Sequence, residues 1–391
     1  MSFKRLSRRT VLQGLAATAI VRTLPSFART PASPRWVLLG TGSGQGIYRA
    51  PWNAATGELG TPELAVTTPH PTYLCVHPFL PVLYACNEDT GDAAAVSAFR
   101  LNRDEAALTP MGHQPSHGDA PCFVSVDRTG RLLFAANYGG GSLACFPLET
   151  SGQPAPADRV FSCAGSNLCG VHGPVQGRQD APHLHCAVLS PDNRFVLACD
   201  LGDDALLAFP IHPASPHPLE NPVRFAARRG SGPRHLAFHP NGRWLYCIHE
   251  LDCTVDLYRW ASHGPVPSAA LVPGSAVSIR PATVSNATGP VTAAEIAISR
   301  DGRFLYASTR GVDLLTVFRI AASDGRLTQV QQLPCGGATP RFFALDPTQR
   351  WLVCPHQDGN SITTFARDAA TGRLTQRSTQ TAGNPECVVW V

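Results

Sequence analysis

The sequence predicts an all-β protein, a seven-bladed β-propeller whose last blade is closed by both ends of the chain. Three observations carry this prediction. The 391 residues include 34 Gly and 35 Pro, which separate short apolar segments as turns do in all-β proteins. A hairpin pattern recurs six times along the chain, and a seventh copy is split between its two ends.

The clearest hairpin lies between residues 232 and 258. Its predicted strands, Arg234–Phe238 and Trp244–His249, are rich in aromatic and aliphatic residues, and the Pro-Asn-Gly sequence between them is a good turn former. A third strand follows the polar residues that begin at Glu250. Because the hairpin is antiparallel, Arg234 at the start of its first strand and Glu250 after its second lie at the same end.

Five further copies of this hairpin define the period of the repeat. The six copies begin at Pro71, Pro121, Pro182, Pro233, Ala293 and Pro340. Their second strands end at positions 88, 138, 201, 250, 310 and 357, which are 47 to 63 residues apart. Such an interval holds four short strands, which is one propeller blade with loop insertions.

The seventh copy is divided between the two ends of the chain. Residues 385–391 match only the first strand of the hairpin, whereas residues 35–41 match the second and residues 46–49 follow as a third. Joined, these segments complete one blade and pair its edge strands. We therefore predict one propeller domain over residues 29–391. A six-bladed ring with a free tail is the alternative, and the period disfavours a β-sandwich.

The first 28 residues are predicted to be a twin-arginine signal peptide. Residues 7–13 read Ser-Arg-Arg-Thr-Val-Leu-Gln, the apolar run over 11–21 is too short to span a membrane, and residues 26–28 offer small side chains for cleavage. A basic disordered arm is the alternative. The signal predicts export by the twin-arginine machinery to the periplasm, with no stable membrane association after cleavage. We expect the exported protein to be a monomer.

The positive charge of the chain belongs to this segment. The formal net charge is +4, and residues 1–28 contain five basic and no acidic residues, so the rest of the chain is slightly acidic at −1. A basic surface for nucleic acid is therefore not expected.

The 13 cysteines show no paired metal-binding spacing. Most lie in strand-like runs, where a buried thiol behaves as a small apolar residue. Since the periplasm is oxidising, Cys163 and Cys169 in one polar loop are the first candidates for a disulfide.

That loop belongs to a long interval, residues 150–180, which we expect to cover one face of the propeller together with residues 262–292. His172 within it is either a lid residue or a solvated histidine.

Two sets of residues are expected to meet at one end of the channel. In a propeller the first strand of each hairpin lines the channel, and its start lies beside the end of the second strand. The starts are Thr72, Cys122, His185, Arg234, Ala294, Arg341 and Glu386. The ends are Gly42, Glu88, Tyr138, Leu201, Glu250, Arg310 and Gln357. Because the strands between them are apolar, these charged and polar residues indicate a pocket rather than a solvated rim.

This set of side chains suits the attack of water on an ester-like carbonyl. Glu250 or His185 could take the proton, while Arg234 and Arg310 could bind an anion or stabilise an oxyanion. No Gly-x-Ser-x-Gly motif is present, which disfavours an acyl-enzyme route.

A metal site is the less favoured interpretation. His183 and His185 share a face of one predicted strand, and other blades contribute His235, His249 and His356. A His-x-His pair is a weak signal, however, and the nearby arginines would repel a cation. No metal and no other cofactor is therefore expected.

At these positions the chain resembles the lactonase family of seven-bladed propellers. The similar motifs, which extend from about residue 35 to the C-terminus, are Asn137-Tyr-Gly-Gly-Gly141, Pro182-His-Leu-His185, Gly232-Pro-Arg-His235, Glu250-Leu-Asp252 and Thr309-Arg310. The family includes bacterial 6-phosphogluconolactonases of the propeller type and fungal 3-carboxy-cis,cis-muconate lactonizing enzymes.

The resemblance implies a site and an activity. The catalytic set of the lactonizing enzymes falls on His185, Arg234, Glu250 and Arg310, without a metal. The expected substrate-binding residues are Glu88, Asn137, Tyr138, His183, Arg341 and Gln357. The implied function is hydrolysis of a sugar lactone by general-base catalysis, and export favours a substrate without phosphate. The alternatives are a carboxymuconate-type cycloisomerase and a non-catalytic periplasmic binding propeller.

Overall fold

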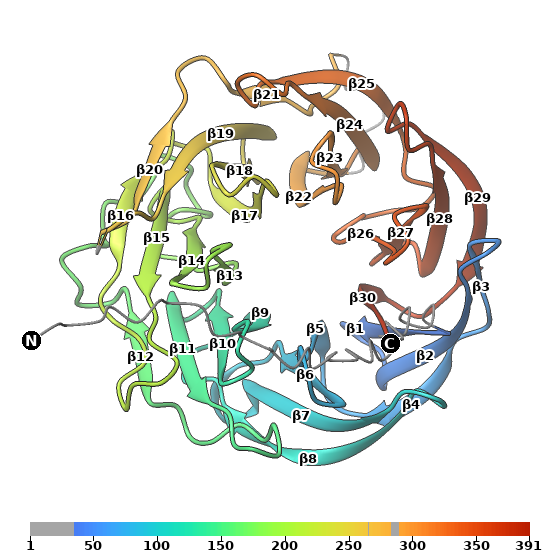
Figure 1. Cartoon of the computed structure of the whole chain (residues 1–391), viewed down its shortest axis with the longest axis horizontal. Coiled ribbons are helices and arrows are strands. Elements are labelled where there is room, and N and C mark those ends of the chain that lie inside the picture. The colour runs from blue at the N-terminus through green and yellow to red at the C-terminus, as the bar shows by residue number, and fades with distance from the viewer. Residues whose placement is uncertain (1–34, 265, 283–288) are drawn as a thin grey trace, which may run out of the picture. The chain divides into compact units, whose positions relative to one another are not determined.

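The computed structural model describes residues 35–264, 266–282 and 289–391, and within them the strands form seven antiparallel sheets. The sheets follow one another around a central axis, and the first strand of each hairpin lies nearest this axis (Figure 1). The prediction of an all-β, seven-bladed propeller is confirmed. The predicted signal peptide, residues 1–28, lies outside the described residues. Among those described, none forms a helix long and apolar enough to cross a membrane.

The first three blades come from the Pro71, Pro121 and Pro182 hairpins. Blade 1 contains β5 (Pro71–Val76), β6 (Val82–Asn87), β7 (Ala95–Asn102) and β8 (Ala107–Pro115), with a short 3-10 helix, η1 (Gly91–Ala93). Blade 2 contains β9 (Pro121–Val126), β10 (Leu132–Asn137), β11 (Ser142–Pro147) and β12 (Arg159–Ser162). Blade 3 contains β13 (Val188–Leu189), β14 (Phe195–Asp200), β15 (Ala205–Pro210) and β16 (Val223–Ala226).

The next three blades repeat this order. Blade 4 contains β17 (Pro233–Phe238), β18 (Trp244–His249), β19 (Thr254–Ala261), β20 (Ser268–Leu271) and β21 (Val277–Ser278). Blade 5 contains β22 (Thr292–Ile298), β23 (Phe304–Arg310), β24 (Leu314–Ile320) and β25 (Leu327–Pro334). Blade 6 contains β26 (Ala344–Leu345), β27 (Trp351–His356), β28 (Ser361–Arg367) and β29 (Leu374–Thr381).

Blade 7 is closed by both ends of the chain, as predicted. It contains β30 (Pro385–Trp390), β1 (Trp36–Thr41), β2 (Gly46–Asn53), β3 (Glu58–Leu59) and β4 (Glu63–Thr67). The innermost strand β30 pairs antiparallel with β1, and Leu38 lies opposite Val389. This pairing leaves no unpaired edge at the junction and ties the C-terminal strand into the ring.

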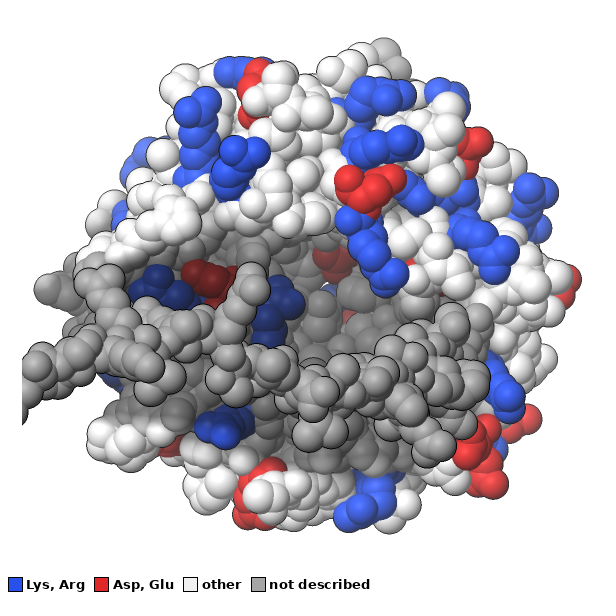
Figure 2. Space-filling view, in the orientation of Figure 1, with Lys and Arg blue, Asp and Glu red and all other residues white. Residues whose placement is uncertain are grey.

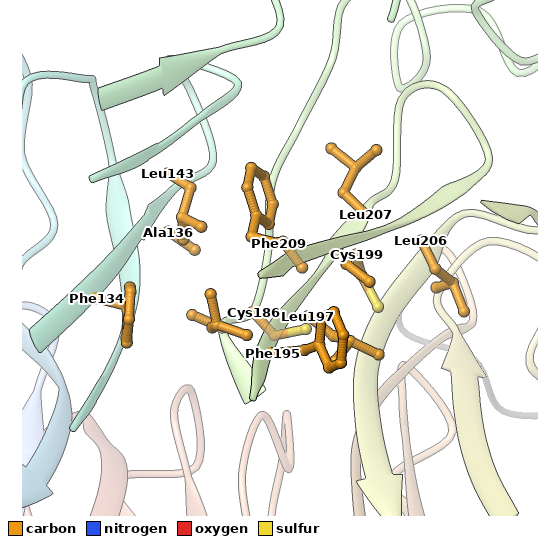
Figure 3. Packing of buried hydrophobic residues seen from close by; sticks show 14 of the residues in the cluster. Phe134, Ala136, Leu143, Cys186, Phe195, Leu197, Cys199, Leu206, Leu207 and Phe209 are labelled. Carbon is orange, nitrogen blue, oxygen red and sulfur yellow. The ribbon is translucent and has the colours of Figure 1, made fainter. Parts of the chain in front are cut away.

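The second strand of each blade is buried on both faces by its neighbours. All six residues of β18 are buried, which explains why these strands read as continuous apolar runs rather than alternating ones. Figure 3 shows such an interface, where Phe134 and Leu143 of blade 2 face Phe195 and Phe209 of blade 3. Each fully buried side chain of this size stabilises the fold by about 1.5–3 kcal/mol.

Two differences from the predicted strands concern blades 3 and 6, whose inner strands have only two residues each. In blade 3 the chain before β13 still pairs locally, because the His185 backbone N–H donates to the Cys199 carbonyl over 2.9 Å. The side chain of His185 is therefore positioned as in a regular strand.

The predicted disulfide between Cys163 and Cys169 is confirmed, with 5.3 Å between its Cα atoms. The other eleven cysteines are free thiols, and ten of them are buried.

Candidate active site

The starts of the inner strands meet in one cavity at the channel. Acidic and basic side chains lie within the central hollow of the ring (Figure 2). The cavity is lined by Thr72, Tyr73, Cys122, His185, Arg234, His235, Arg341, Phe342 and Glu386. Six of the seven predicted strand starts are in this set, and the seventh, Ala294, accepts a hydrogen bond from Arg234 Nη1 at 2.7 Å through its carbonyl. Larger pockets elsewhere on the described surface lack such buried Arg and Glu side chains.

Glu250 lies among three arginines. Its Oε2 is 3.0 Å from Arg234 Nε, and its Oε1 is 3.1 Å from Arg310 Nη2 and also accepts a hydrogen bond from Arg178 Nη2. Burial would raise the pKa of this carboxyl, but Arg310, Arg234 and Arg178 outweigh burial and lower it to about 2. Glu250 is therefore ionised, and both of its oxygens are engaged.

Arg234 is almost completely enclosed, with 1% of its side chain exposed. Burial and the neighbouring charge of Arg310 lower its pKa to about 10, against the opposing effect of Glu250. The guanidinium remains charged at neutral pH, and its hydrogen bonds to Glu250 and to the Ala294 carbonyl fix its orientation.

Arg310 carries a spare donor beside the same carboxylate. Its Nη2 donates to the Ala293 carbonyl at 3.2 Å. Its Nε is buried and has no hydrogen-bond partner within the part of the chain that the structure describes. Since a buried donor is normally satisfied, this N–H is available to a bound oxygen atom.

A second ionic cluster lies around Arg341. Its Nη2 binds both oxygens of Glu88, at 2.8 and 3.1 Å, and its Nε lies 3.3 Å from Glu386 Oε2. The two carboxylates outweigh burial and raise the pKa of Arg341, whereas burial raises the pKa of Glu386. Arg341 is therefore compensated by protein carboxyl groups from blades 1 and 7.

His185 is a neutral imidazole in the cavity. Burial, followed by the charge of Arg234, holds its pKa well below the usual value of 6.5. Its ring packs edge-on against Tyr138 at 5.5 Å and against His235 at 5.0 Å, and Nδ1 lies 3.8 Å from Cys122 Sγ. A neutral ring nitrogen can accept a proton from water.

Tyr138 and His183 form a stacked pair, with ring centroids 4.3 Å apart and planes 10° from parallel. His183 Nδ1 donates to the Tyr138 carbonyl at 2.9 Å, which leaves Nε2 as the acceptor in the neutral ring. Tyr138 also contacts Arg178 through its hydroxyl, at 3.5 Å.

Gln357 is half-buried directly after β27, and its backbone N–H donates to the Thr339 carbonyl.

Asn137 is placed differently from our expectation of substrate binding. Its side chain is fully buried and donates to the Ser116 carbonyl and to Ser142 Oγ, both at 2.9 Å. These bonds hold the turn that presents Tyr138. Asn137 therefore supports that turn and is not among the residues that line the cavity.

The interval over residues 150–180 contributes a residue that the sequence analysis missed. His172, the candidate lid residue, is bound to Asp203 at 2.7 Å. Arg178 reaches Glu250 instead. Because so long a loop has no strand periodicity, the repeat could not identify Arg178. The only signal in the sequence was that Arg178 is a basic residue within the segment predicted to cover one face of the propeller.

Aromatic residues next to the predicted strand starts were also missed. Tyr73 stacks on Phe123 at 4.2 Å and packs edge-on against Phe342 at 5.7 Å, while His235 binds Glu295 at 3.1 Å. Tyr73 and Phe342 form an apolar part of the cavity.

Two of the histidines considered as metal ligands, His249 and His356, are bound to residues of their own blades. His249 lies 3.0 Å from Asp256, and His356 lies 3.0 Å from Thr363 Oγ1. Among the described residues the one compact group of possible ligands is Cys163, Cys169 and Asp200, whose two cysteines form the disulfide.

The fold and this cavity define a class of protein, a seven-bladed propeller with buried ionic and imidazole groups at one end of its channel. The family model described as lactonase, 7-bladed beta-propeller, matches residues 36–390. The chain therefore belongs to the lactonase family of seven-bladed β-propellers, which confirms the resemblance seen in the sequence.

Individual relatives agree with this assignment. The chain is 30% identical to the 6-phosphogluconolactonase of Bacillus subtilis over 348 residues, which cover 89% of this chain and 95% of that protein. The periplasmic gluconolactonase of Pseudomonas aeruginosa has a similar structure, with a TM-score of 0.81 and 29% identity, covering 91% of this chain and 98% of that one.

Proposed function

We propose that this protein is a lactonase that adds water to a sugar lactone and releases the open-chain hydroxy acid. The observation that carries the proposal is a cavity lined by both neutral His185 and Arg234, with ionised Glu250 linking Arg234 to Arg310 and its spare donor. The family assignment supports it independently.

In this proposal His185 is the general base. Glu250 has a pKa of about 2 and binds three guanidinium groups, so it is a poor proton acceptor and serves to hold Arg234 and Arg310. The oxygen of a water molecule forms a bond to the lactone carbonyl carbon while His185 takes its proton. His185 then returns this proton to the ring oxygen as the ester C–O bond breaks.

The arginines stabilise the charge that develops on the carbonyl oxygen. Arg310 Nε, buried and unpaired among the described residues, suits the oxyanion of the tetrahedral intermediate. Arg234 contributes charge from its fixed position. Removing one such donor typically costs about 10²–10³ in kcat.

We favour a lactone without a phosphate group. The four arginines of the site, Arg178, Arg234, Arg310 and Arg341, pair with three carboxyl groups, Glu88, Glu250 and Glu386. A phosphate dianion would require more unpaired positive charge than this. The structural similarity to a periplasmic gluconolactonase supports the same choice.

We further propose that residues 1–28 direct export by the twin-arginine machinery and that the mature protein is a periplasmic monomer. The twin-arginine sequence at residues 7–13 supports this. A reporter fused after residue 28 should reach the periplasm in cells with the pathway and stay in the cytoplasm in cells without it. Export of a variant with Arg8 and Arg9 changed to Lys would contradict the proposal.

A cycloisomerase is less well supported. Such an enzyme must bind several carboxylates, and Arg341, the residue considered for that role, is already paired with Glu88 and Glu386. Incubation with a carboxymuconate, followed by ultraviolet absorbance, separates the two reactions.

The decisive experiment measures lactone hydrolysis by the purified chain from residue 29 onward. Glucono-δ-lactone, its 6-phosphorylated form and a carboxymuconate are compared, with the spontaneous rate subtracted. We expect hydrolysis of the unphosphorylated lactone and its loss in His185→Ala. Equal rates for the wild type and His185→Ala would exclude the proposed base.

A further inference from the structure

Arg178 is the most exposed of the three arginines on Glu250. Its side chain is 36% exposed, compared with 1% for Arg234 and 19% for Arg310. It comes from the long loop between β12 and β13, whereas the other two lie on blade strands. Its guanidinium bonds to side-chain oxygens of the described residues, those of Glu250 and Tyr138.

The backbone that carries Arg178 is anchored on both sides. The Cys163–Cys169 disulfide closes the start of the loop, and the Gly173 backbone N–H donates to the Gly202 carbonyl at 2.9 Å. On the other side Gln179 Nε2 donates to the Leu201 carbonyl at 2.8 Å and to Asp204 Oδ1 at 2.9 Å. The loop is thus held on the turn between β14 and β15, and the guanidinium is presented to Glu250 and Tyr138.

Glu250 does not depend on Arg178 for charge compensation. Arg234 binds one of its oxygens and Arg310 the other, so two cations already face one carboxylate. Arg178 shares Oε1 with Arg310 and adds a third cation. A partly exposed ion pair is weak, which means that a second carboxylate could take Arg178 away without leaving Glu250 unpaired.

We propose that Arg178 is an anion-binding residue. It breaks its ion pair with Glu250 and binds the carboxylate of the hydroxy acid that forms when the lactone opens. This inference rests on the proposed function and deepens it. A guanidinium binds a carboxylate through two parallel hydrogen bonds, a geometry that a neutral lactone carbonyl cannot supply. Arg178 therefore distinguishes the product from the substrate, and it makes the enzyme sensitive to its product.

The test compares wild type with Arg178→Gln, Arg178→Lys and the matched control Arg128→Gln. Arg128 is an exposed arginine in the turn between β9 and β10, at the end of blade 2 away from the cavity. Binding of gluconate, of 6-phosphogluconate and of sorbitol, which lacks the carboxylate, is measured by calorimetry. Thermal unfolding of each variant shows that it is folded.

We expect wild type and Arg128→Gln to bind gluconate more tightly than sorbitol. In Arg178→Gln gluconate binding should fall by about tenfold or more, the loss expected for a hydrogen bond between charged groups, with partial recovery in Arg178→Lys. Where hydrolysis is measurable, inhibition by gluconate should weaken by the same factor, while KM for the neutral lactone changes less.

Two results would overturn the assignment. Equal gluconate affinity in wild type and Arg178→Gln would show that Arg178 does not bind the carboxylate. A loss confined to 6-phosphogluconate would show that it binds a phosphate instead. Because gluconate binding is measured without turnover, failure of the lactonase proposal and failure of this inference are distinguishable.

Discussion

Arg234 Nε lies 3.0 Å from Glu250 Oε2, and both side chains are buried, although sixteen positions separate them in the sequence. The register of one hairpin makes this pair, since Pro233 lies opposite His249 in the β17–β18 ladder. The ion pair therefore follows from strand pairing within blade 4. Its partners Arg310 and Arg178 come from another blade and from a loop.

Removing the charge of Glu250 should damage both stability and activity. Glu250→Gln leaves Arg234 buried without its main counter-ion, and breaking a buried pair in this way costs about 3–5 kcal/mol. We expect a lower midpoint in urea unfolding and a fall of about 10²–10³ in kcat/KM as the arginines lose their positions. Glu149→Gln, which removes an exposed carboxylate in blade 2, is the control and should match wild type.

The contribution of Glu250 to stability should depend on pH. Its pKa is lowered from 4.5 in the unfolded chain to about 2 in the fold, so its stabilising effect is present above pH 4.5 and is lost as the pH falls towards 2. Urea unfolding of wild type and Glu250→Gln across this range measures the effect. The difference between them should shrink on acidification, and a constant difference would contradict this account.

The pH profile of hydrolysis should report the low pKa of His185. Since this pKa lies well below 6.5, the imidazole is already unprotonated above that value. We expect kcat/KM, corrected for spontaneous hydrolysis, to be flat from about pH 6.5 to about pH 8 and to decrease only in more acidic solution. An acid limb centred near pH 6.5 in wild type would argue against His185 as the base.

Loss of the disulfide should change the position of the loop that carries Arg178 more than it changes the stability of the propeller. Cys163 and Cys169 are only six positions apart, so their cross-link constrains little of the unfolded chain. The Cys163→Ser/Cys169→Ser variant should unfold close to wild type in urea but bind gluconate more weakly, because Arg178 loses its anchored backbone. Cys145→Ser, in a buried strand position of blade 2, provides the contrasting case, with reduced stability.

A glycine at the opposite end of the blades should be intolerant of a side chain. Gly302 has φ +72°, and an added Cβ would lie 2.5 Å from His239 Nε2, which bonds the Gly302 carbonyl across the interface of blades 4 and 5. Gly302→Ala should therefore destabilise the protein by about 1–3 kcal/mol in urea unfolding. Gly383→Ala, where no atom lies within 4 Å, should differ little from wild type.

Strand pairing explains why much of the site was predictable. Thr72, His185, Arg234 and Arg341 occupy the same place in different copies of a hairpin, and a ring brings equal positions to one axis. Asn137 was expected from the family resemblance and not from this repeat, which selects Tyr138. It ends a strand as Arg310 does, yet its amide nitrogen donates to Ser116 and Ser142, and Asn137 is not among the residues that line the cavity.

The sequence by itself determined the all-β class, the number of blades, the closure by both ends and the convergence of charged residues. Each of these depends on short-range pairing and on a repeat that can be counted. Only the tertiary structure decided that Arg178 joins Arg234 and Arg310 on Glu250, because a loop of this length has no period and its course depends on contacts with a neighbouring blade. The protonation of Glu250 and His185 was decided there too, since a pKa reflects burial and the charges that folding gathers around the group.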